Sequence, residues 1–445
     1  MQVLFVSLGC DKNLVDSEHM LGQLLERGCT LTDDEEQAEI IIINTCCFIL
    51  DAKEESVENI LQMAEYRKKG SCRALIVTGC MAERYRQEIL DEIPEVDAVL
   101  GTNSLDRIGE VLDKALAGQK SVTMSELKGL PALQGRRLVT TGGHYEYLKI
   151  AEGCDKHCTY CIIPHLRGSY RSVPMEELLQ EAETMVKDGV RELILVAQET
   201  TVYGVDLYGE KSLHILLKKL CQIGELHWIR ILYCYPEEIY PEMVQVMREE
   251  PKICHYLDLP IQHANDEILR RMGRRTGKQQ LIDTVRMLRE AMPDIVLRTT
   301  LISGFPGETK AQHEELMAFV DEMEFERLGV FPYSAEEGTP AAVMPDQVPE
   351  ETKQRRRDEI LSLQQEISAD LGQSLIGTVQ EVQIEGFVPD ENAYVGRTCG
   401  DAPGVDGYCF VQTARQLESG DFVQVHITGA LEYDLIGELE DEFTE

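Results

Sequence analysis

The segment from Cys154 to Cys161 carries three cysteines in Cys-x3-Cys-x2-Cys spacing, and it constrains the chain more than any other stretch. Three thiolates on one short loop can each bind one iron of a cubane 4Fe–4S cluster, which leaves the fourth iron without a protein ligand. A structural zinc site would need a fourth Cys or His at finger-like spacing, and His157 and His165 do not fit that pattern. The spacing therefore favours an open cluster on Cys154, Cys158 and Cys161, whose free iron can bind a substrate.

Three further cysteines each stand just beyond a short apolar run near the start of the chain. These runs predict strands. Run 3–6 precedes Cys10, run 40–43 precedes Cys46, and run 75–78 precedes Cys80. A segment with helical spacing follows each one, at 16–27, 51–69 and 82–90. In an open parallel sheet the carboxyl ends of the strands line one crevice. We therefore expect the three cysteines to converge on a second cluster.

Two alternatives remain for this second set. Free cysteines are often buried as small hydrophobic residues, although three of them at equivalent strand ends favour a shared site. Cys47 adjoins Cys46, and successive residues of a strand point to opposite faces. The position directly after Asn44 and Thr45 favours Cys46 as the ligand.

The rest of the chain predicts two more domains. From residue 147 onward, strand-like runs alternate with helix-length segments, which indicates an open (β/α)6 barrel whose strand-following loops form the site. Residues 119–142 show no clear period, and short alternating segments near the end predict a small antiparallel β-barrel. The predicted division is an N-terminal doubly wound parallel sheet domain, a linker, a central barrel and a C-terminal barrel, at 1–118, 119–142, 143–372 and 373–445.

Composition places limits on location and partners. The 14 cysteines are spread over 445 residues rather than packed into a short secreted scaffold, and the N-terminus lacks a secretory pattern. The longest apolar runs, such as 40–43, are too short for a membrane span. We expect a cytoplasmic protein without a membrane partner. Its formal net charge of −36 should repel polyphosphate and attract basic partners.

The cluster loop, with Tyr160 just before its last cysteine, resembles the signature of the radical S-adenosylmethionine (SAM) enzymes. The resemblance implies that SAM chelates the open iron and is cleaved to a radical that removes hydrogen from an unactivated carbon. Further segments resemble the methylthiotransferase branch of that superfamily, in order along nearly the whole chain. They include 9–13, 44–46, 79–82, 161–164, 197–201, 259–263 and 298–308.

Membership of that branch would imply two 4Fe–4S clusters and two uses of SAM, as radical source and as methyl donor. The N-terminal cluster would carry the inserted sulfur, so that a C–H bond becomes C–S–CH3. The resemblance places Tyr160 near the adenine, and makes Gln198, Glu199, Gln262 and Arg298 candidates for holding SAM or substrate. For each of these four, a structural hydrogen bond within a loop is the alternative. An electron donor such as flavodoxin or ferredoxin is also implied.

The C-terminal region resembles the TRAM domain, often an RNA-binding module. From 373 to 445 it holds 15 Asp and Glu against Arg397 and Arg415, with no Lys. Because RNA binding depends on Lys and Arg at phosphates, nucleic acid is not expected to be the direct substrate. Segments 11–13, 161–168, 198–201, 206–209 and 233–236 also resemble the protein-modifying branch.

The resemblance thus implies a transferase that forms 3-methylthioaspartate at the β-carbon of an aspartate in S-twelve, a basic small-subunit ribosomal protein. A tRNA adenosine methylthiotransferase is the alternative within the family. A non-catalytic two-cluster electron carrier is the alternative from another class, and it explains neither the barrel-length segment nor the third domain.

Overall fold

The computed structural model describes residues 1–133 and 135–443 and separates into two compact units. The first unit comprises 1–140, 149–173 and 334–343, and the second comprises 141–148, 174–333 and 344–445. Residue 134 of the predicted linker and residues 444–445 of the predicted C-terminal domain lie outside the described residues. Both cysteine triads belong to the first unit.

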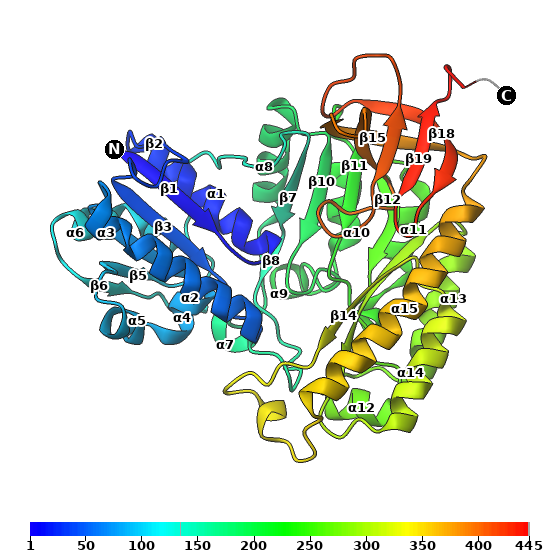
Figure 1. Ribbon diagram of the computed structural model, residues 1–445, viewed down its shortest axis with the longest axis horizontal. Helices are drawn as coiled ribbons and strands as arrows, with labels where there is room; N and C mark the ends of the chain where they lie inside the picture. Colours follow the sequence, from blue (N-terminus) through cyan, green and yellow to red (C-terminus); the bar gives the residue numbers. More distant parts are fainter. Residues whose placement is uncertain (134, 444–445) are drawn as a thin grey trace. The chain divides into compact units, whose positions relative to one another are not determined.

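A six-stranded parallel sheet forms the centre of the first unit, with strand order β2-β1-β3-β4-β5-β6 (Figure 1). Its strands are β1 (Gln2–Ser7), β2 (Thr30–Leu31), β3 (Ile40–Thr45), β4 (Ala74–Gly79), β5 (Ala98–Leu100) and β6 (Ser121–Thr123). Its helices are α1 (Asp11–Glu26), α2 (Leu50–Ala64), α3 (Tyr66–Lys69), α4 (Cys80–Tyr85), α5 (Gln87–Glu92), η1 (Leu105–Arg107) and α6 (Ile108–Leu116). Strand β6 lies inside the segment that the sequence assigns to the linker.

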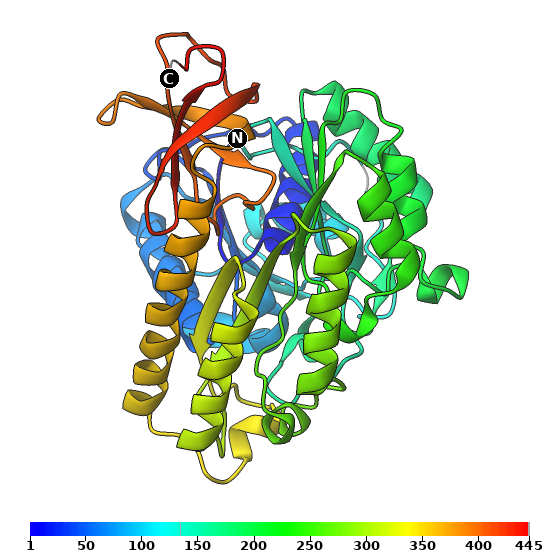
Figure 2. The ribbon, with the colours of Figure 1, turned by 90° about the vertical axis from the view of Figure 1, so that its right-hand side faces the viewer.

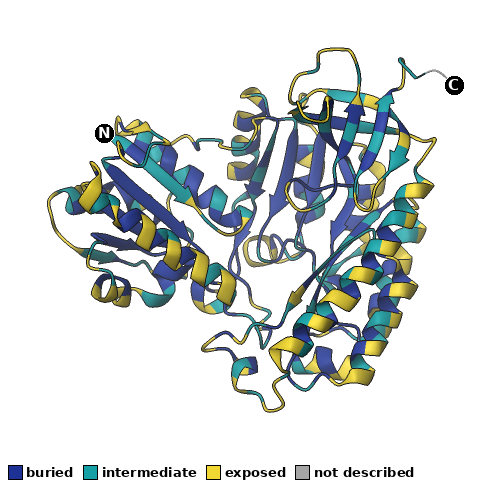
Figure 3. Cartoon of the chain, in the orientation of Figure 1, coloured by how far each residue is buried: buried dark blue, intermediate teal, exposed yellow. Residues whose placement is uncertain are grey.

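Helices cover both faces of this sheet because its central strand is apolar on both sides. Ile41 and Ile43 pack in a core that includes Ile60 of α2, whereas Ile40 and Ile42 pack in a separate core with residues of α1 and α6. All four isoleucines are fully buried, and the central strands are dark blue in Figure 3. Strands buried on both faces are typical of doubly wound sheets. The predicted doubly wound parallel sheet of the N-terminal domain is therefore confirmed.

A short hairpin frames the Cys154–Cys161 loop within the first unit. Strands β8 (Ala151–Glu152) and β9 (Arg171–Ser172) pair antiparallel, and α7 (Ile163–Arg167) lies between them in sequence. The Cys154 amide donates to the Gly168 carbonyl at 3.1 Å. The segment with η3 (Pro340–Val343) also belongs to this unit, and the Ala341 amide donates to the Thr159 carbonyl at 2.9 Å.

The second unit contains an open six-stranded sheet with order β14-β13-β12-β11-β10-β7, so the predicted open barrel is confirmed. Neighbouring pairs from β10 to β14 are parallel. The strands are β7 (Tyr145–Lys149), β10 (Glu192–Val196), β11 (Trp228–Ile231), β12 (Ile253–Asp258), β13 (Val296–Ser303) and β14 (Arg327–Pro332). The longer helices are α8 (Met175–Lys187), α10 (Leu213–Leu220), α11 (Pro241–Glu249), α13 (Lys278–Ala291), α14 (Lys310–Met323) and α15 (Glu350–Ser374) (Figure 2). The short ones are α9 (Val205–Tyr208), η2 (Pro236–Glu238) and α12 (Asp266–Arg271).

The chain ends in a small closed barrel with strand order β15-β16-β17-β19-β18. Its strands are β15 (Val379–Val388), β16 (Ala393–Thr398), β17 (Cys409–Gln412), β18 (Phe422–Ala430) and β19 (Leu435–Leu439). Alternate residues such as Val382, Ile384, Val425 and Ile427 fill its core. The predicted small barrel is confirmed, although β17 and β19 run parallel where the prediction was wholly antiparallel.

An ion pair and several hydrogen bonds join this small barrel to the sheet strands of the second unit. Arg327, which begins β14, pairs with Asp401, and the Tyr256 hydroxyl donates to Asp406 at 2.6 Å. Arg230 of β11 donates to Glu192 and to the Cys399 carbonyl, both at 2.8 Å. Catalytic groups of parallel barrels lie at the opposite, carboxyl end. The C-terminal barrel therefore packs at the amino ends of the strands, which serve stability rather than catalysis in parallel barrels.

Candidate functional site

Cys10, Cys46 and Cys80 lie at the carboxyl ends of three neighbouring strands, β1, β3 and β4. The pKa of the Cys46 thiol is raised to about 12, chiefly by burial, and the nearby Cys80 and Cys10 contribute to the rise. Burial likewise raises the pKa of the Cys80 thiol, and the nearby Cys10 contributes to this rise. The structure therefore brings together the three cysteines that the sequence expects to converge.

Two glycines allow the loops that carry these cysteines to approach closely. Gly9 has a φ of +87°, and a Cβ added there would lie 2.7 Å from the Cys46 Cβ. Gly79 has a φ of +90°, and its added Cβ would lie 2.3 Å from the Asn44 Oδ1. Positive φ and this lack of space both require glycine. Asn13 then fixes the approach, because its Nδ2 donates to the carbonyls of Leu8 and Thr45, each at 3.0 Å.

Cys46 and its neighbour Cys47 have different surroundings. Cys47 is fully buried in the core that contains Ile41. The pKa of Cys47 is also raised to about 12, chiefly by burial with a contribution from nearby Cys80, while the charge of Arg84 and a hydrogen bond with it oppose the rise. Cys46 instead lies near both Cys10 and Cys80.

Glu336 organises the cations near this triad. It accepts from Lys53 of α2 at 2.8 Å and from Arg84 of α4 at 3.2 Å, and only 2% of its side chain is exposed. The Ser334 hydroxyl accepts from the Leu50 amide, where α2 begins. The 334–343 segment therefore fastens the two helices that follow Cys46 and Cys80.

The second triad lies on the loop between β8 and α7. Burial raises the pKa of the Cys161 thiol, and Cys158 and Cys154 both raise it further, so the three thiols are near neighbours. The Cys161 amide donates to the Cys158 carbonyl at 3.0 Å, and His157 has a φ of +52°. This tight loop thus brings Cys154, Cys158 and Cys161 close together. Within residues 1–133 and 135–443, no three His, Cys, Asp or Glu side chains are grouped so as to hold a single metal ion.

A buried arginine links the loop of the second triad to the first, and the sequence analysis missed it. Arg167, at the end of α7, is 2% exposed, and its Nη2 donates to the Cys80 Sγ at 3.5 Å and to the Asn13 Oδ1. Its Nη1 donates to Asp16 at 2.7 Å and to Glu152 at 3.1 Å. Burial opposes the charge, but Cys80, Glu152 and Asp16 raise the pKa of Arg167 well above its ordinary value. The only sequence signal at Arg167 is its place in the 161–168 segment, which does not reveal its burial or its partners.

The predicted SAM-binding residues are divided between the two units. Tyr160 is half-buried in the cysteine loop of the first unit, whereas the other four belong to the second. Gln198 and Gln262 are half-buried in loops beyond β10 and β12. Gln262 has a φ of +69°, and its backbone bonds to Thr300 and Ile302, each at 2.8 Å.

Glu199 and Arg298 are engaged by protein groups. The Glu199 carboxylate is 1% exposed and accepts from the Thr201 amide at 3.1 Å. Arg298 donates to Asp258 at 2.9 Å and lies 3.4 Å from Asp406 of the C-terminal barrel. Asp258 also accepts from the Tyr233 amide at 3.0 Å. These two side chains thus hold loops and strands in position.

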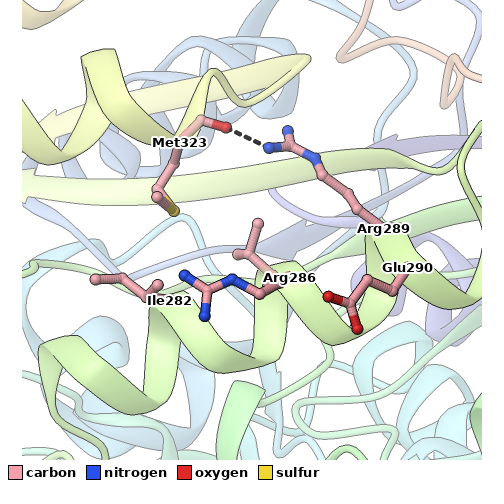
Figure 4. Close-up of a pocket in the computed structure, with 6 residues that line it drawn as sticks. Ile282, Arg286, Arg289, Glu290 and Met323 are labelled. Atoms are coloured by element: carbon pink, nitrogen blue, oxygen red, sulfur yellow. Dashed lines mark hydrogen bonds between the residues drawn. The ribbon is translucent and has the colours of Figure 1, made fainter.

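One hollow of the second unit lies apart from these residues. It measures about 330 Å³ and lies between α13 and α14, lined by Ile282, Val285, Arg286, Arg289, Glu290 and Met323. Figure 4 shows the Arg289 guanidinium reaching the Met323 carbonyl, a contact of 2.6 Å. Its lining includes none of the predicted site residues.

The donor sets of both triads fit 4Fe–4S clusters. All six cysteines are free thiols, and each set has three soft sulfur ligands from one confined region. Burial disfavours isolated thiolates, so these thiols would be stabilised as thiolates by the iron that they bind. A cluster with three protein ligands leaves one iron open.

Comparisons with known proteins identify the three parts of the chain. The model of the radical SAM superfamily matches residues 148–320, that of uncharacterized protein family UPF0004 matches 2–101, and that of the TRAM domain matches 376–439. A solved radical SAM methyltransferase, TsrM from Kitasatospora setae, has a TM-score of 0.55 at 12% identity, covering 85% of this chain and 80% of that one. That likeness supports the fold alone.

Curated relatives match over almost the whole length. Ribosomal protein uS12 methylthiotransferase RimO of Lachnoclostridium phytofermentans is 58% identical over 99% of this chain and 100% of the relative. The protein of the same name from Desulforamulus reducens is 49% identical over 98% of each chain. The barrel, the cysteine loops and the TRAM domain define a radical SAM methylthiotransferase. The chain belongs to the RimO family.

Two conclusions come directly from this membership. The chain is a transferase of the radical SAM superfamily, and the superfamily implies a 4Fe–4S cluster and SAM. In the part of the chain that the structure describes, no helix is both long and apolar enough to cross a membrane.

Proposed function

We propose that this chain carries two 4Fe–4S clusters and converts an aspartate of ribosomal protein uS12 to 3-methylthioaspartate at its β-carbon. The observation that carries the proposal is the presence of two cysteine triads in one compact unit, linked by Arg167. The activity named for the full-length relatives supplies the substrate protein. Cys154, Cys158 and Cys161 would hold the cluster that binds SAM, and Cys10, Cys46 and Cys80 would hold the other.

When bound, the open cluster supplies the electron that cleaves SAM, and the other cluster supplies the sulfur that is inserted. The chain's own residues fix where these events occur. Gly9 and Gly79 let the strand-end loops approach, and Asn13 holds them together. Glu336 fixes the helices after Cys46 and Cys80 through Lys53 and Arg84. Cys46 and Cys80 are buried, whereas Cys10 is exposed.

For SAM, we assign direct contact to Tyr160, Gln198 and Gln262. Glu199 and Arg298 are assigned an indirect role. Glu199 already accepts from Thr201, and Arg298 already pairs with Asp258 and Asp406. Arg298 holds Asp258, and Asp258 in turn holds the Tyr233 amide in a loop at the carboxyl end of β11. Loss of Arg298 would therefore disturb this loop rather than remove a ligand of SAM.

The C-terminal barrel is assigned to recruitment of the basic substrate. Asp390, Glu391, Glu418 and Asp421 are exposed, and they project a negative field toward a basic ribosomal protein. The same field disfavours nucleic acid as direct substrate. We assign the reaction to the cytoplasm, with a flavodoxin- or ferredoxin-like protein as the electron donor.

Mass spectrometry on a strain that lacks the gene tests the substrate. We expect ribosomal protein uS12 to lose the mass of one methylthio group at a single aspartate, and a plasmid copy of the gene to restore it. The plasmid copy with Cys154→Ala serves as the control and should not restore it. Loss of the methylthio group from tRNA instead, with uS12 unchanged, would identify the chain as a tRNA adenosine methylthiotransferase.

A further inference from the structure

Arg167 presents two different edges to its surroundings. Its Nη1 faces carboxylates, at 2.7 Å from Asp16 and 3.1 Å from Glu152. Its Nη2 faces the Cys80 Sγ at 3.5 Å and the Asn13 amide oxygen. Because the guanidinium is planar and its donors are fixed in direction, the two carboxylates hold the edge that faces sulfur in place.

The two carboxylates also have a second cation. Lys149 pairs with Asp16 and, at 3.0 Å, with Glu152. Two carboxylates and two cations therefore balance one another, and the side chains of Asp16 and Arg167 are each 2% exposed. The Nη2 edge of Arg167 thus lies against Cys80 within a network that is already neutral.

We propose that Arg167 sets the reduction potential of the cluster on Cys10, Cys46 and Cys80. The proposal rests on the N-terminal cluster of the proposed function. An N–H donor and a buried positive charge at a ligand sulfur stabilise the reduced form, which carries one more negative charge, and so raise the potential. Because Asp16 and Glu152 offset the charge of Arg167, the effect comes chiefly from the N–H edge that faces the Cys80 Sγ.

Arg167 follows Cys161 by six residues, so the same short segment holds one triad and tunes the other. Arg167 is a positioning residue in this role, since it acts through Cys80 rather than on the substrate. The alternative is that Arg167 only joins secondary-structure elements through its carboxylates. That role would leave the potential unchanged wherever the fold survives.

A redox titration followed by electron paramagnetic resonance separates these roles. The parent protein is the full chain with Cys154, Cys158 and Cys161 changed to Ala, so that only the N-terminal cluster contributes. We expect Arg167→Met to shift the midpoint potential to a more negative value. Asp16→Asn removes a compensating charge with little change of shape, and should shift the potential in the opposite direction.

Arg73→Met is the matched control, because Arg73 is 57% exposed and 3.7 Å from Glu39 in the same unit. It should leave the potential at the parental value. If Arg167→Met loses its iron, Arg167→Lys takes its place and should also shift the potential to a more negative value, because it keeps the charge but loses the planar edge that donates to the Cys80 Sγ. A potential that Asp16→Asn does not move beyond the control, or shifts of the same sign in both buried variants, would refute the role of Arg167. A parent without iron would instead refute the second cluster, and with it the proposed function.

Discussion

Arg397 of the C-terminal barrel and Glu192 of β10 form an ion pair with an Nη2–Oε2 distance of 2.8 Å, and both side chains are fully buried. Arg230 holds the same carboxylate from β11, also at 2.8 Å. From 373 to 445 the only Lys or Arg besides Arg397 is Arg415, which pairs with Asp441. Both arginines of this domain are therefore neutralised by acidic partners.

Arg397→Met should destabilise the second unit by about 3–5 kcal/mol, because it leaves Glu192 buried with one cation fewer. Thermal unfolding followed by circular dichroism measures the effect. Arg415→Met is the matched control, since Arg415 is 50% exposed and a surface pair contributes about 0–1 kcal/mol. Equal melting temperatures for the two variants would contradict this account of the interface.

The same pair predicts a pH dependence. Burial alone would raise the pKa of Glu192, but Arg397 and Arg230 lower it below its ordinary value of 4.5. A carboxylate with a lowered pKa in the folded state contributes stability that is present above its unfolded pKa and is lost as the pH falls through the folded pKa. The melting-temperature difference between wild type and Glu192→Gln should therefore be largest above pH 4.5 and shrink below it. A difference independent of pH would contradict this linkage.

Iron analysis tests the two-cluster assignment. Reconstituted protein should bind about eight irons per chain, since each cubane contains four. Replacing Cys10, Cys46 and Cys80 by Ala should remove half of the iron and leave SAM cleavage intact. Replacing Cys154, Cys158 and Cys161 should remove the other half and abolish cleavage. Wild-type protein with the iron of a single cubane would contradict the assignment.

Cys46 and Cys47 should respond differently to substitution. Cys47→Ser should keep both clusters and most activity, because the Cys47 thiol lies in the core beside Arg84. Cys46→Ser should reduce the iron content toward that of one cluster. The opposite pattern, with iron lost only in Cys47→Ser, would show that Cys47 is the ligand.

Charge reversal tests recruitment by the C-terminal barrel. Changing the exposed Asp390, Glu391 and Asp421 to Lys should raise KM for the ribosomal protein and weaken its dependence on salt, because steering by surface charge is screened by ions. SAM cleavage without substrate should be unchanged.

The control reverses the charge of three acidic residues that lie outside the C-terminal barrel. Glu314, Asp321 and Glu322 are exposed on α14, and their change to Lys should leave KM near that of the wild type. Similar KM values in both sets would show that total charge, rather than the C-terminal barrel, attracts the substrate.

The sequence predicted those features that depend on local pattern. Isoleucines alternating between the two faces of β3 identify a strand buried on both sides. The position of Cys46 at the end of that strand could be predicted from the same pattern. Helix breaks were harder to predict. The expected helix at 82–90 is two helices, α4 and α5, because Arg86 adopts a φ of +45° and folds back to donate to the Glu83 carbonyl.

The partners of charged residues could not be predicted, because they depend on distant segments. Arg167 meets Asp16 across 151 residues, and Arg397 meets Glu192 across 205. The charge count for 373–445 treats Arg397 like any other arginine, although it is fully buried. The same limit applies to Arg298, whose partner Asp406 comes from another predicted domain.

The docking of Glu336 between Lys53 and Arg84 has a consequence for synthesis of the chain. The first unit is built from three separate stretches, and its last one ends at residue 343. The N-terminal sheet can fold early, but the ion pairs behind Cys46 and Cys80 form only after most of the polypeptide has left the ribosome. Contacts between residues so far apart in sequence form slowly. A nascent chain thus exposes unpaired cations beside its first cysteine triad, and loading of metal there should follow, rather than guide, completion of the fold.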